Sequence, residues 1–248
     1  HITQFDTSNF EVKIAGEVII DLEKHISKKE LNRMDRFSAF SLIAAEEAIN
    51  QSKIIEYDDF DSNRAGVIVG SGIGGISTFE SQHKRLLENP KRVSPFFIPS
   101  MISDIACGHI SIRYNFKGPN FAAISACSSA SHSIGTAYEM IKNDKADVMV
   151  TGGSEATITP MAVAGFSNMR ALTKNPDPNQ ACRPFDKERD GFVMGEGSGI
   201  LIIEELEFAK KRGANIIAEI SGYGSSADAF HLTSPDPTGK GAYNSMQN

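Results

Sequence analysis

Cys127 is the side chain in this sequence that is best placed to act as a nucleophile. It lies in the run Phe121-Ala-Ala-Ile-Ser-Ala-Cys-Ser-Ser-Ala-Ser-His132, where an apolar, β-branched segment gives way to small residues. A thiolate rather than a thiol attacks acyl groups, so a reactive cysteine needs surroundings that stabilise negative charge. The first backbone N–H groups and the dipole of a helix stabilise such charge, and they would also stabilise an oxyanion. The spacing therefore indicates a candidate nucleophile, with an incidental thiol in a tightly packed helix start as the alternative.

The other two cysteines are expected to be unreactive. Three cysteines at irregular, wide spacings fit neither a disulfide framework nor a zinc site. Cys107 lies in the apolar helical pattern Ile105-Ala-Cys-Gly-His-Ile110, which is typical of a small buried thiol, and Cys182 lies in a polar loop. We expect that the protein needs no metal ion or organic cofactor.

Apolar periodicity predicts the elements that must position Cys127. It predicts a long helix from Lys29 to Ser52, a helix from Pro99 through His109, and a helix from Leu206 that ends at Gly213. Five short apolar runs are expected to be strands: Arg64 to Gly70, Phe121 to Ala126, Asp147 to Gly153, Ile200 to Glu204 and Asn215 to Ser221. Strands that alternate with helices predict an α/β fold, in which a parallel or mixed sheet is covered on both faces.

Composition narrows the class of protein. The chain has 248 residues, of which 40% are apolar and 23% are charged, as in an ordinary globular protein. Its net charge of -6 argues against binding to nucleic acid, which requires an excess of clustered Lys and Arg. No apolar run approaches the roughly 18 residues of a membrane span, and the amino end lacks the pattern of a signal peptide. We therefore expect a cytoplasmic protein with no membrane span.

Several motifs, distributed over nearly the whole chain, resemble those of one enzyme family. They are Gln4-Phe-Asp-Thr-Ser8, Met34-Asp-Arg-Phe37, Gly70-Ser-Gly-Ile-Gly-Gly75, Ser94-Pro-Phe-Phe-Ile-Pro-Ser100, Ser125-Ala-Cys-Ser-Ser129, Ala146-Asp-Val-Met-Val-Thr-Gly-Gly-Ser-Glu155, Arg183-Pro-Phe-Asp-Lys-Glu-Arg-Asp-Gly-Phe192 and Asp228-Ala-Phe-His-Leu-Thr-Ser-Pro235. The sequence is similar to the elongating β-ketoacyl-acyl carrier protein synthases, type II most closely. The resemblance implies a thiolase-like layered α-β-α-β-α fold.

The resemblance also implies an acyltransferase of type II fatty acid biosynthesis. Cys127 matches the family nucleophile, which accepts an acyl group from acyl carrier protein, and its own N–H would be one oxyanion donor. Malonyl carrier protein would then lose carbon dioxide and attack the acyl-cysteine, to give a 3-oxoacyl chain two carbons longer. The implied partners are acyl carrier protein and a second copy of the chain in a homodimer.

Other site residues follow from the resemblance alone. An acyl pocket is implied at Ile73, Ala126 and Phe166, with Phe97 and Ile102 contributed by a dimer partner; ordinary core packing is the alternative for each. A loop that gates access is implied at Asp228, His231 and Thr233, with plain solvation as the alternative. A basic patch for the acidic carrier protein is implied at Lys29, Arg33, Lys91, Arg92 and Arg170, with scattered surface charges as the alternative.

The chain departs from the family pattern at both ends. We expect residues 1–205 to form the first thiolase-like half without its first, central strand, which would leave a gap in the core, and residues 206–248 to begin the second half. The family's two further catalytic histidines and its lysine match nothing in this sequence and are expected beyond Asn248. His132, five residues after Cys127, is expected to face elsewhere. Alone, these residues would at most be acylated at Cys127.

Two alternatives from other classes remain at this stage. The pattern Gly70-x-Gly72-x-x-Gly75 follows a strand and formally fits a dinucleotide-binding loop, although the Pro-rich stretch Val93 to Pro99 stands where a second strand is needed. The chain could also be a non-catalytic thiolase-fold subunit, but such subunits lack the cysteine.

Overall fold

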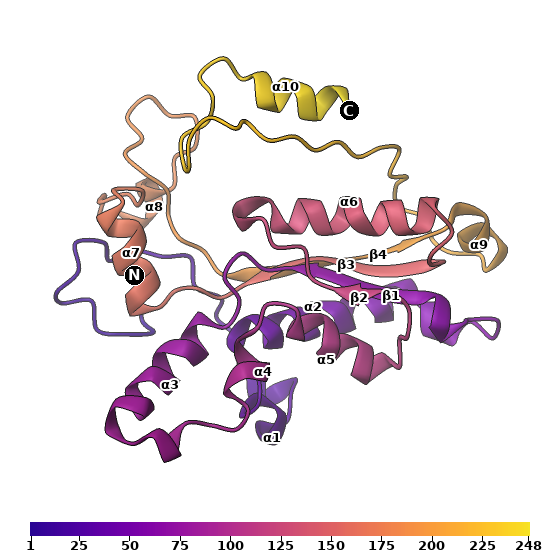
Figure 1. Ribbon diagram of the computed structural model, residues 1–248, viewed down its shortest axis with the longest axis horizontal. Coiled ribbons are helices and arrows are strands. Elements are labelled where there is room, and N and C mark those ends of the chain that lie inside the picture. The colour runs from indigo at the N-terminus through magenta and orange to yellow at the C-terminus, as the bar shows by residue number, and fades with distance from the viewer.

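The core of the protein is a four-stranded mixed sheet, seen in a computed structural model that describes all residues from 1 to 248 (Figure 1). Its strands are β1 (Ala65–Gly70), β2 (Asn120–Phe121), β3 (Val148–Glu155) and β4 (Gly197–Glu204). The order across the sheet is β2-β1-β3-β4. Strand β1 is parallel to both β2 and β3, whereas β4 is antiparallel to β3. The α/β class expected from the alternation of elements is confirmed.

Helices surround this sheet and connect its strands. The α-helices are α1 (Lys28–Leu31), α2 (Arg36–Ser52), α3 (Ile76–Glu88), α4 (Phe97–Met101), α5 (Ile105–Tyr114), α6 (Ser129–Lys142), α7 (Pro160–Asn168), α8 (Pro178–Ala181), α9 (Leu206–Lys211) and α10 (Lys240–Gln247). Short 3₁₀ helices are η1 (Leu22–Lys24), η2 (Ile54–Glu56), η3 (Ser62–Arg64), η4 (Pro90–Arg92) and η5 (Ala126–Ser128). None of these helices is both long and apolar enough to cross a membrane.

The two faces of the sheet are covered by different helices, as Figure 1 shows. Because side chains alternate along a strand, Val67 and Val69 pack with Leu42 of α2 and Ile110 of α5 in the largest core cluster. Ile68, between those two valines, packs instead in the cluster that includes Ala137 of α6. Strand β1 is buried on both faces, which explains its continuous apolar sequence.

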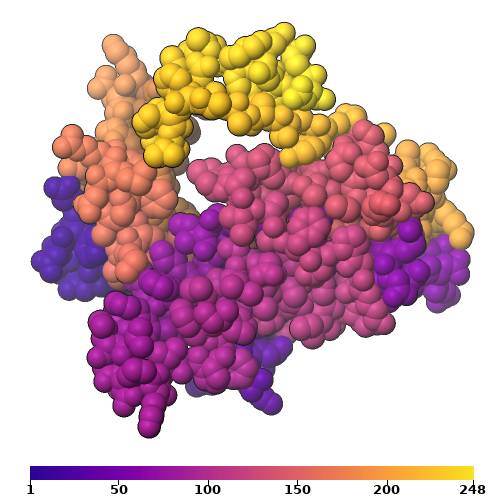
Figure 2. Space-filling model, viewed as in Figure 1, coloured from indigo at the N-terminus to yellow at the C-terminus, as the bar shows by residue number.

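Two further layers lie beyond α6. An extended segment over residues 214–224 runs across α6 on the side away from the sheet, and α10 lies outside it (Figure 1). The contact is close: a Cβ added to Gly135 of α6 would lie 2.1 Å from the ring of Tyr223. Helices, sheet, α6, extended segment and α10 are stacked in the order that a layered α-β-α-β-α fold requires. The space-filling view shows an opening beneath the C-terminal segment (Figure 2).

Several expected elements differ from those observed. The segment from Asn215 to Ser221 is extended but is not a strand, because no neighbouring strand pairs with it. The single helix expected from Lys29 to Ser52 is divided into α1 and α2. The Asp35 side chain accepts a hydrogen bond from the N–H of Phe37 (3.4 Å) and so caps the N-terminus of α2. Only Phe121 of the strand expected as Phe121 to Ala126 is paired, in β2.

Strands β1 and β3 are neighbours at the centre of the sheet. Strands β1 and β3 pair directly over six consecutive residues, from Ala65 opposite Val148 to Gly70 opposite Gly153. The helix expected from Pro99 is also two helices, α4 and α5, because Ile102 between them has an extended backbone (ψ 141°). The expected helix after Leu206 is confirmed as α9, and Gly213 follows it with a left-handed φ of 70°.

Candidate active site at Cys127

The turn that carries Cys127 joins β2 to α6 through the 3₁₀ helix η5. Ala126 has a φ of 51°, a left-handed conformation that is unfavourable for a residue with a Cβ. The hydroxyl of Ser129 stabilises this turn, because it donates to the carbonyl of Ala126 (2.7 Å) and accepts from the N–H of Ser125 (2.9 Å). A chain reversal is thereby fixed immediately before the cysteine.

Cys127 is exposed, and its N–H makes no hydrogen bond within the protein. A thiol in this position is accessible to a partner or substrate. The N–H beside it is available to a carbonyl oxygen of an acyl group that reaches the sulfur. Since α6 follows directly with fourteen residues, the start of its dipole also acts on charge at this position.

Small residues allow the first turn of α6 to lie directly on the ends of β1 and β3. A Cβ added to Gly70 would lie 2.4 Å from the carbonyl oxygen of Ser129. A Cβ added to Gly153 would lie 2.6 Å from the Cβ of Ala130. Cys127 therefore lies at the carboxyl ends of parallel strands, which is where α/β proteins usually bind ligands.

The glycine turn after β1 holds the carboxylate of the protein's own Glu155. Glu155 Oε2 accepts from the N–H groups of Gly72 (2.7 Å) and Ile73 (3.2 Å), and Oε1 accepts from the hydroxyl of Ser71 (3.1 Å). Burial raises the pKa of Glu155 above its usual value, while these hydrogen bonds oppose the shift. Because an internal carboxylate takes the N–H groups that a phosphate would need, the dinucleotide-binding alternative is wrong.

His132 contacts Ser125 and Tyr223, and it makes no hydrogen bond to Cys127. Its Nδ1 lies 2.6 Å from the hydroxyl oxygen of Ser125, two residues before Cys127. The edge of its ring also meets the ring of Tyr223, with 6.3 Å between centroids. Ser125 lies outside α6 and folds back beside it, which brings its hydroxyl within reach of His132.

Three of the residues expected to line an acyl pocket, Ile73, Ala126 and Ile102, lie at the glycine turn, and the other two lie near α3, which follows this turn. Ile73 belongs to the turn, and a Cβ on Gly72 would lie 3.3 Å from the carbonyl oxygen of Ala126. The N–H of Gly75 donates to Met101 (2.9 Å), which brings the neighbouring Ile102 to the same turn. Phe97 lies against Phe79 of α3 (6.5 Å between centroids), and Phe166 shares a cluster with Ile76, the first residue of α3.

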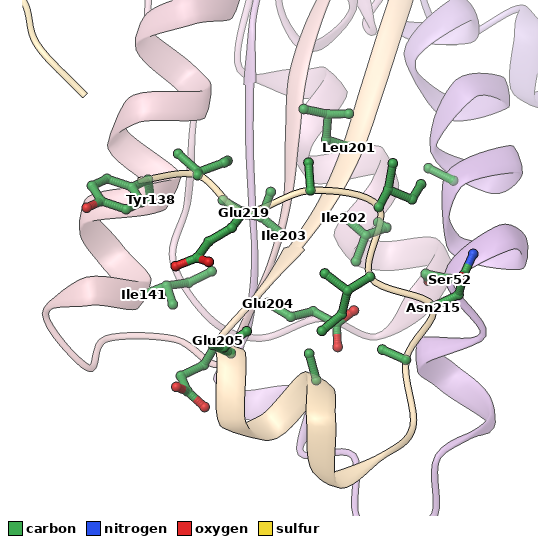
Figure 3. Close-up of a pocket in the computed structure, with 18 of the residues that line it drawn as sticks. Ser52, Tyr138, Ile141, Leu201, Ile202, Ile203, Glu204, Glu205, Asn215 and Glu219 are labelled. Carbon is green, nitrogen blue, oxygen red and sulfur yellow. The ribbon is translucent and has the colours of Figure 1, made fainter. Parts of the chain in front are cut away.

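A cavity lined largely by apolar residues lies elsewhere in the structure. It has a volume of about 710 Å³ and lies between β4, the last turn of α6, α9 and the extended segment, with Tyr138, Ile202 and Glu204 in its walls (Figure 3). None of the residues expected in the acyl pocket lines it. It follows the free edge of β4, where no further strand is paired.

The expected gating loop is folded by its own hydrogen bonds. Nδ1 of His231 accepts from the N–H groups of Thr233 and Ser234 (both 3.1 Å), and Asp228 accepts from the N–H of Asp236 (2.8 Å). Asp228, His231 and Thr233 are all exposed. They make no hydrogen bond to the Cys127 turn.

The five basic residues expected to form a patch are all exposed, but they do not form one cluster. Arg33 lies over the ring of Phe96 beside α4 (4.5 Å), and Lys29 precedes it in α1. Lys91 and Arg92 follow α3, where Arg92 pairs with Glu88. Arg170 follows α7, which lies away from α1 in Figure 1.

Comparison with known proteins agrees with this geometry. Residues 18–209 match the family model for the β-ketoacyl synthase N-terminal domain. Over 248 residues the chain is 52% identical to 3-oxoacyl-[acyl-carrier-protein] synthase 2 of Staphylococcus aureus strain N315, covering 99% of this chain and 60% of that protein. It thus spans about three-fifths of the length of this curated relative.

Solved structures give the same result. A β-ketoacyl synthase from Burkholderia phymatum superposes with a TM-score of 0.85 at 28% identity, covering 97% of this chain and 61% of that one. A ketosynthase bound to a hexaketide and in complex with its type II polyketide acyl-carrier protein gives a TM-score of 0.74 at 25% identity, over 86% of this chain and 60% of that one. The fold, the position of the cysteine turn and the sequence together show that this chain belongs to the β-ketoacyl synthase family.

Proposed function

We propose that this chain carries the acylation site of a 3-oxoacyl-[acyl-carrier-protein] synthase, with Cys127 as the nucleophile. The observation that carries this proposal is an exposed thiol beside an unbonded N–H at the start of α6. A thiol buried in a packed helix start, the alternative from the sequence, would have neither feature. The non-catalytic subunit gains no support, because the cysteine is present and accessible.

The first step is transfer of an acyl group to Cys127. The thiolate attacks the carbonyl carbon of the acyl-carrier thioester, and the N–H of Cys127 donates to the resulting oxyanion. Collapse of this intermediate breaks the bond to the carrier's sulfur, which leaves and takes up a proton. The small neighbours of the cysteine, such as Ala126 and Ser128, leave room for the acyl chain.

The second step is a decarboxylative condensation. The malonyl thioester loses carbon dioxide, and the electron pair left on its α-carbon attacks the acyl-cysteine carbonyl. Cys127 then leaves as a thiolate, and the product is a 3-oxoacyl thioester two carbons longer. In this proposal residues 1–205 belong to the first thiolase-like half and residues 206–248 to the start of the second. The histidines for decarboxylation would lie beyond Asn248.

The proposed partners are acyl carrier protein and a second copy of this chain, in the cytoplasm. Lys29, Arg33, Lys91 and Arg92 lie on the side of the sheet with α1, α3 and α4 and would attract an acidic carrier. Strand β2 is an edge strand with a free side. Large apolar side chains near it and on α4 are exposed, which supports burial against the second copy; these are Phe96, Ile98, Ile102, Phe121 and Ile124.

Acylation of the intact protein tests this proposal. After incubation with a labelled acyl-carrier thioester, mass spectrometry of peptides should find the acyl group on Cys127 alone. Cys127→Ala should abolish the label, because no other exposed thiol lies at this turn. Cys182→Ala, which removes the other exposed thiol, is the matched control and should be labelled like the wild type. Equal labelling of Cys127→Ala and the wild type would contradict the assignment.

A further inference from the structure

Glu155 joins two segments that are far apart in the sequence and meet at the Cys127 turn. It is the last residue of β3, and its half-buried carboxylate reaches the glycine turn 82 to 84 residues earlier in the chain. No lysine, arginine or histidine pairs with it, so this carboxylate is held by a hydroxyl and by backbone N–H groups alone. A carboxylate held in this way fixes the backbone that donates to it.

The backbone held by Glu155 also lies beside the residue before the nucleophile. A Cβ placed on Gly72 would lie 2.8 Å from Glu155 Oε2 on one side and 3.3 Å from the carbonyl oxygen of Ala126 on the other. A side chain at position 72 would therefore meet both the carboxylate and the Ala126 peptide. Ala126 is also the residue whose left-handed φ of 51° sets the direction of the backbone at Cys127.

We propose that Glu155 is a positioning residue for Cys127: its carboxylate holds the Gly70–Gly75 turn against the Ala126 peptide and so fixes the direction of the Cys127 N–H and sulfur. This inference rests on the proposed function of Cys127. Residues in sparsely populated backbone conformations persist only where the surroundings determine them. Here Ser129 determines the turn from the side of α6, and Glu155 determines it from the side of the sheet.

If Glu155 positions Cys127, its loss should affect two reactions of the Cys127 sulfur, acylation and alkylation, to different extents. Acyl transfer needs the N–H of Cys127 aimed at the oxyanion, whereas alkylation by iodoacetamide forms no oxyanion and needs only an accessible thiolate. Loss of positioning should therefore slow acylation much more than alkylation. A purely structural role for Glu155 would lower the stability of the protein without changing the ratio of the two rates.

The experiment measures both rates at Cys127 in the intact protein carrying Glu155→Gln. We expect acylation by an acyl-carrier thioester to fall at least tenfold and alkylation to change less than threefold. Glu204→Gln is the matched control: Glu204 is the last residue of β4, pairs with Arg212, and lies opposite Val148 at the far end of β3. Val148 and Glu155, at the two ends of β3, are about 23 Å apart at the usual rise of a strand. Both rates in Glu204→Gln should stay within twofold of the wild type.

A second variant covers the case in which Glu155→Gln does not fold. Gly72→Ala leaves every partner in place but inserts a Cβ between the carboxylate and the Ala126 peptide, and it should lower the acylation rate in the same selective way. Acylation within twofold of the wild type in either folded variant would overturn the inference. Failure of the wild type to be acylated at Cys127 would instead overturn the proposed function, and the inference with it.

Discussion

Cys107 and Cys127 lie on elements that cover opposite faces of one sheet, and both are close to the start of a helix. Cys107 is the third residue of α5, and Cys127 lies in η5, two residues before the start of α6. Yet Cys107 is fully buried and Cys127 is exposed. A position at a helix start therefore does not by itself distinguish the candidate nucleophile from a structural thiol. The two thiols differ instead in their exposure to solvent and in the hydrogen bonds around them.

The surroundings of Cys107 favour the neutral thiol. Burial raises its pKa to about 12, and the charge of Asp104 adds to that shift. Its sulfur lies 3.3 Å from the carbonyl oxygen of Phe121 and 3.6 Å from that of Val69, so either oxygen can accept the single S–H proton of the neutral thiol. One N–H, from Val69, opposes the shift by donating to the sulfur. Cys107 thus holds α5 against β1 and does no chemistry.

The largest expected difference between the two thiols is their rate of alkylation. With a pKa of about 12, only about one Cys107 thiol in 10⁴ is ionised at pH 8. We expect iodoacetamide to modify Cys127 at least 1000-fold faster than Cys107 in the folded protein, measured by mass spectrometry of quenched time points. Cys182, which is exposed but does not start a long helix, provides the internal reference. Comparable labelling of Cys107 and Cys127 would remove the contrast.

Sequence patterns predicted the surroundings of Cys107 better than those of Cys127. The apolar neighbours of Cys107 predicted its burial, and the small residues after Cys127 predicted a helix start there, because both are local properties of the chain. The contacts that shape the Cys127 turn are long-range. No periodicity indicates that Glu155 reaches Gly72, or that Ser125 folds back to His132.

The same limit applies to the strands. The runs that became β1, β3 and β4 are apolar and find partners in the sheet, so their prediction succeeded. The run from Asn215 to Ser221 has an equally strong β-branched pattern but no adjacent strand. Pairing depends on what lies beside a segment, which the segment's own residues do not encode.

Alkaline pH should expose the energetic cost of burying Cys107. A folded-state pKa of about 12 against the usual value of 9.0 for a cysteine means that this group's contribution to stability is fully present below pH 9 and is lost as the pH rises towards 12. The three-unit difference corresponds to at most about 4 kcal/mol. Urea unfolding of the wild type and of Cys107→Ala should therefore show a steeper loss of stability in the wild type between pH 9 and 11. Parallel pH profiles would contradict this account, since other groups titrate equally in both proteins.

The smallest expected effect concerns the alanines that precede the two cysteines. Ala106 is buried inside α5, whereas Ala126 has a left-handed φ of 51°. Glycine in a helix costs about 1 kcal/mol, and loss of a buried methyl group adds about 0.8 kcal/mol, so Ala106→Gly should destabilise the protein by about 2 kcal/mol. At position 126 glycine relieves roughly 1 to 2 kcal/mol of backbone strain, offset by about 0.4 to 1 kcal/mol of extra freedom in the unfolded chain. Ala126→Gly should therefore leave the free energy of unfolding unchanged or raise it by up to about 1.6 kcal/mol. Equal losses in urea unfolding of both variants would show that the turn before Cys127 is not strained.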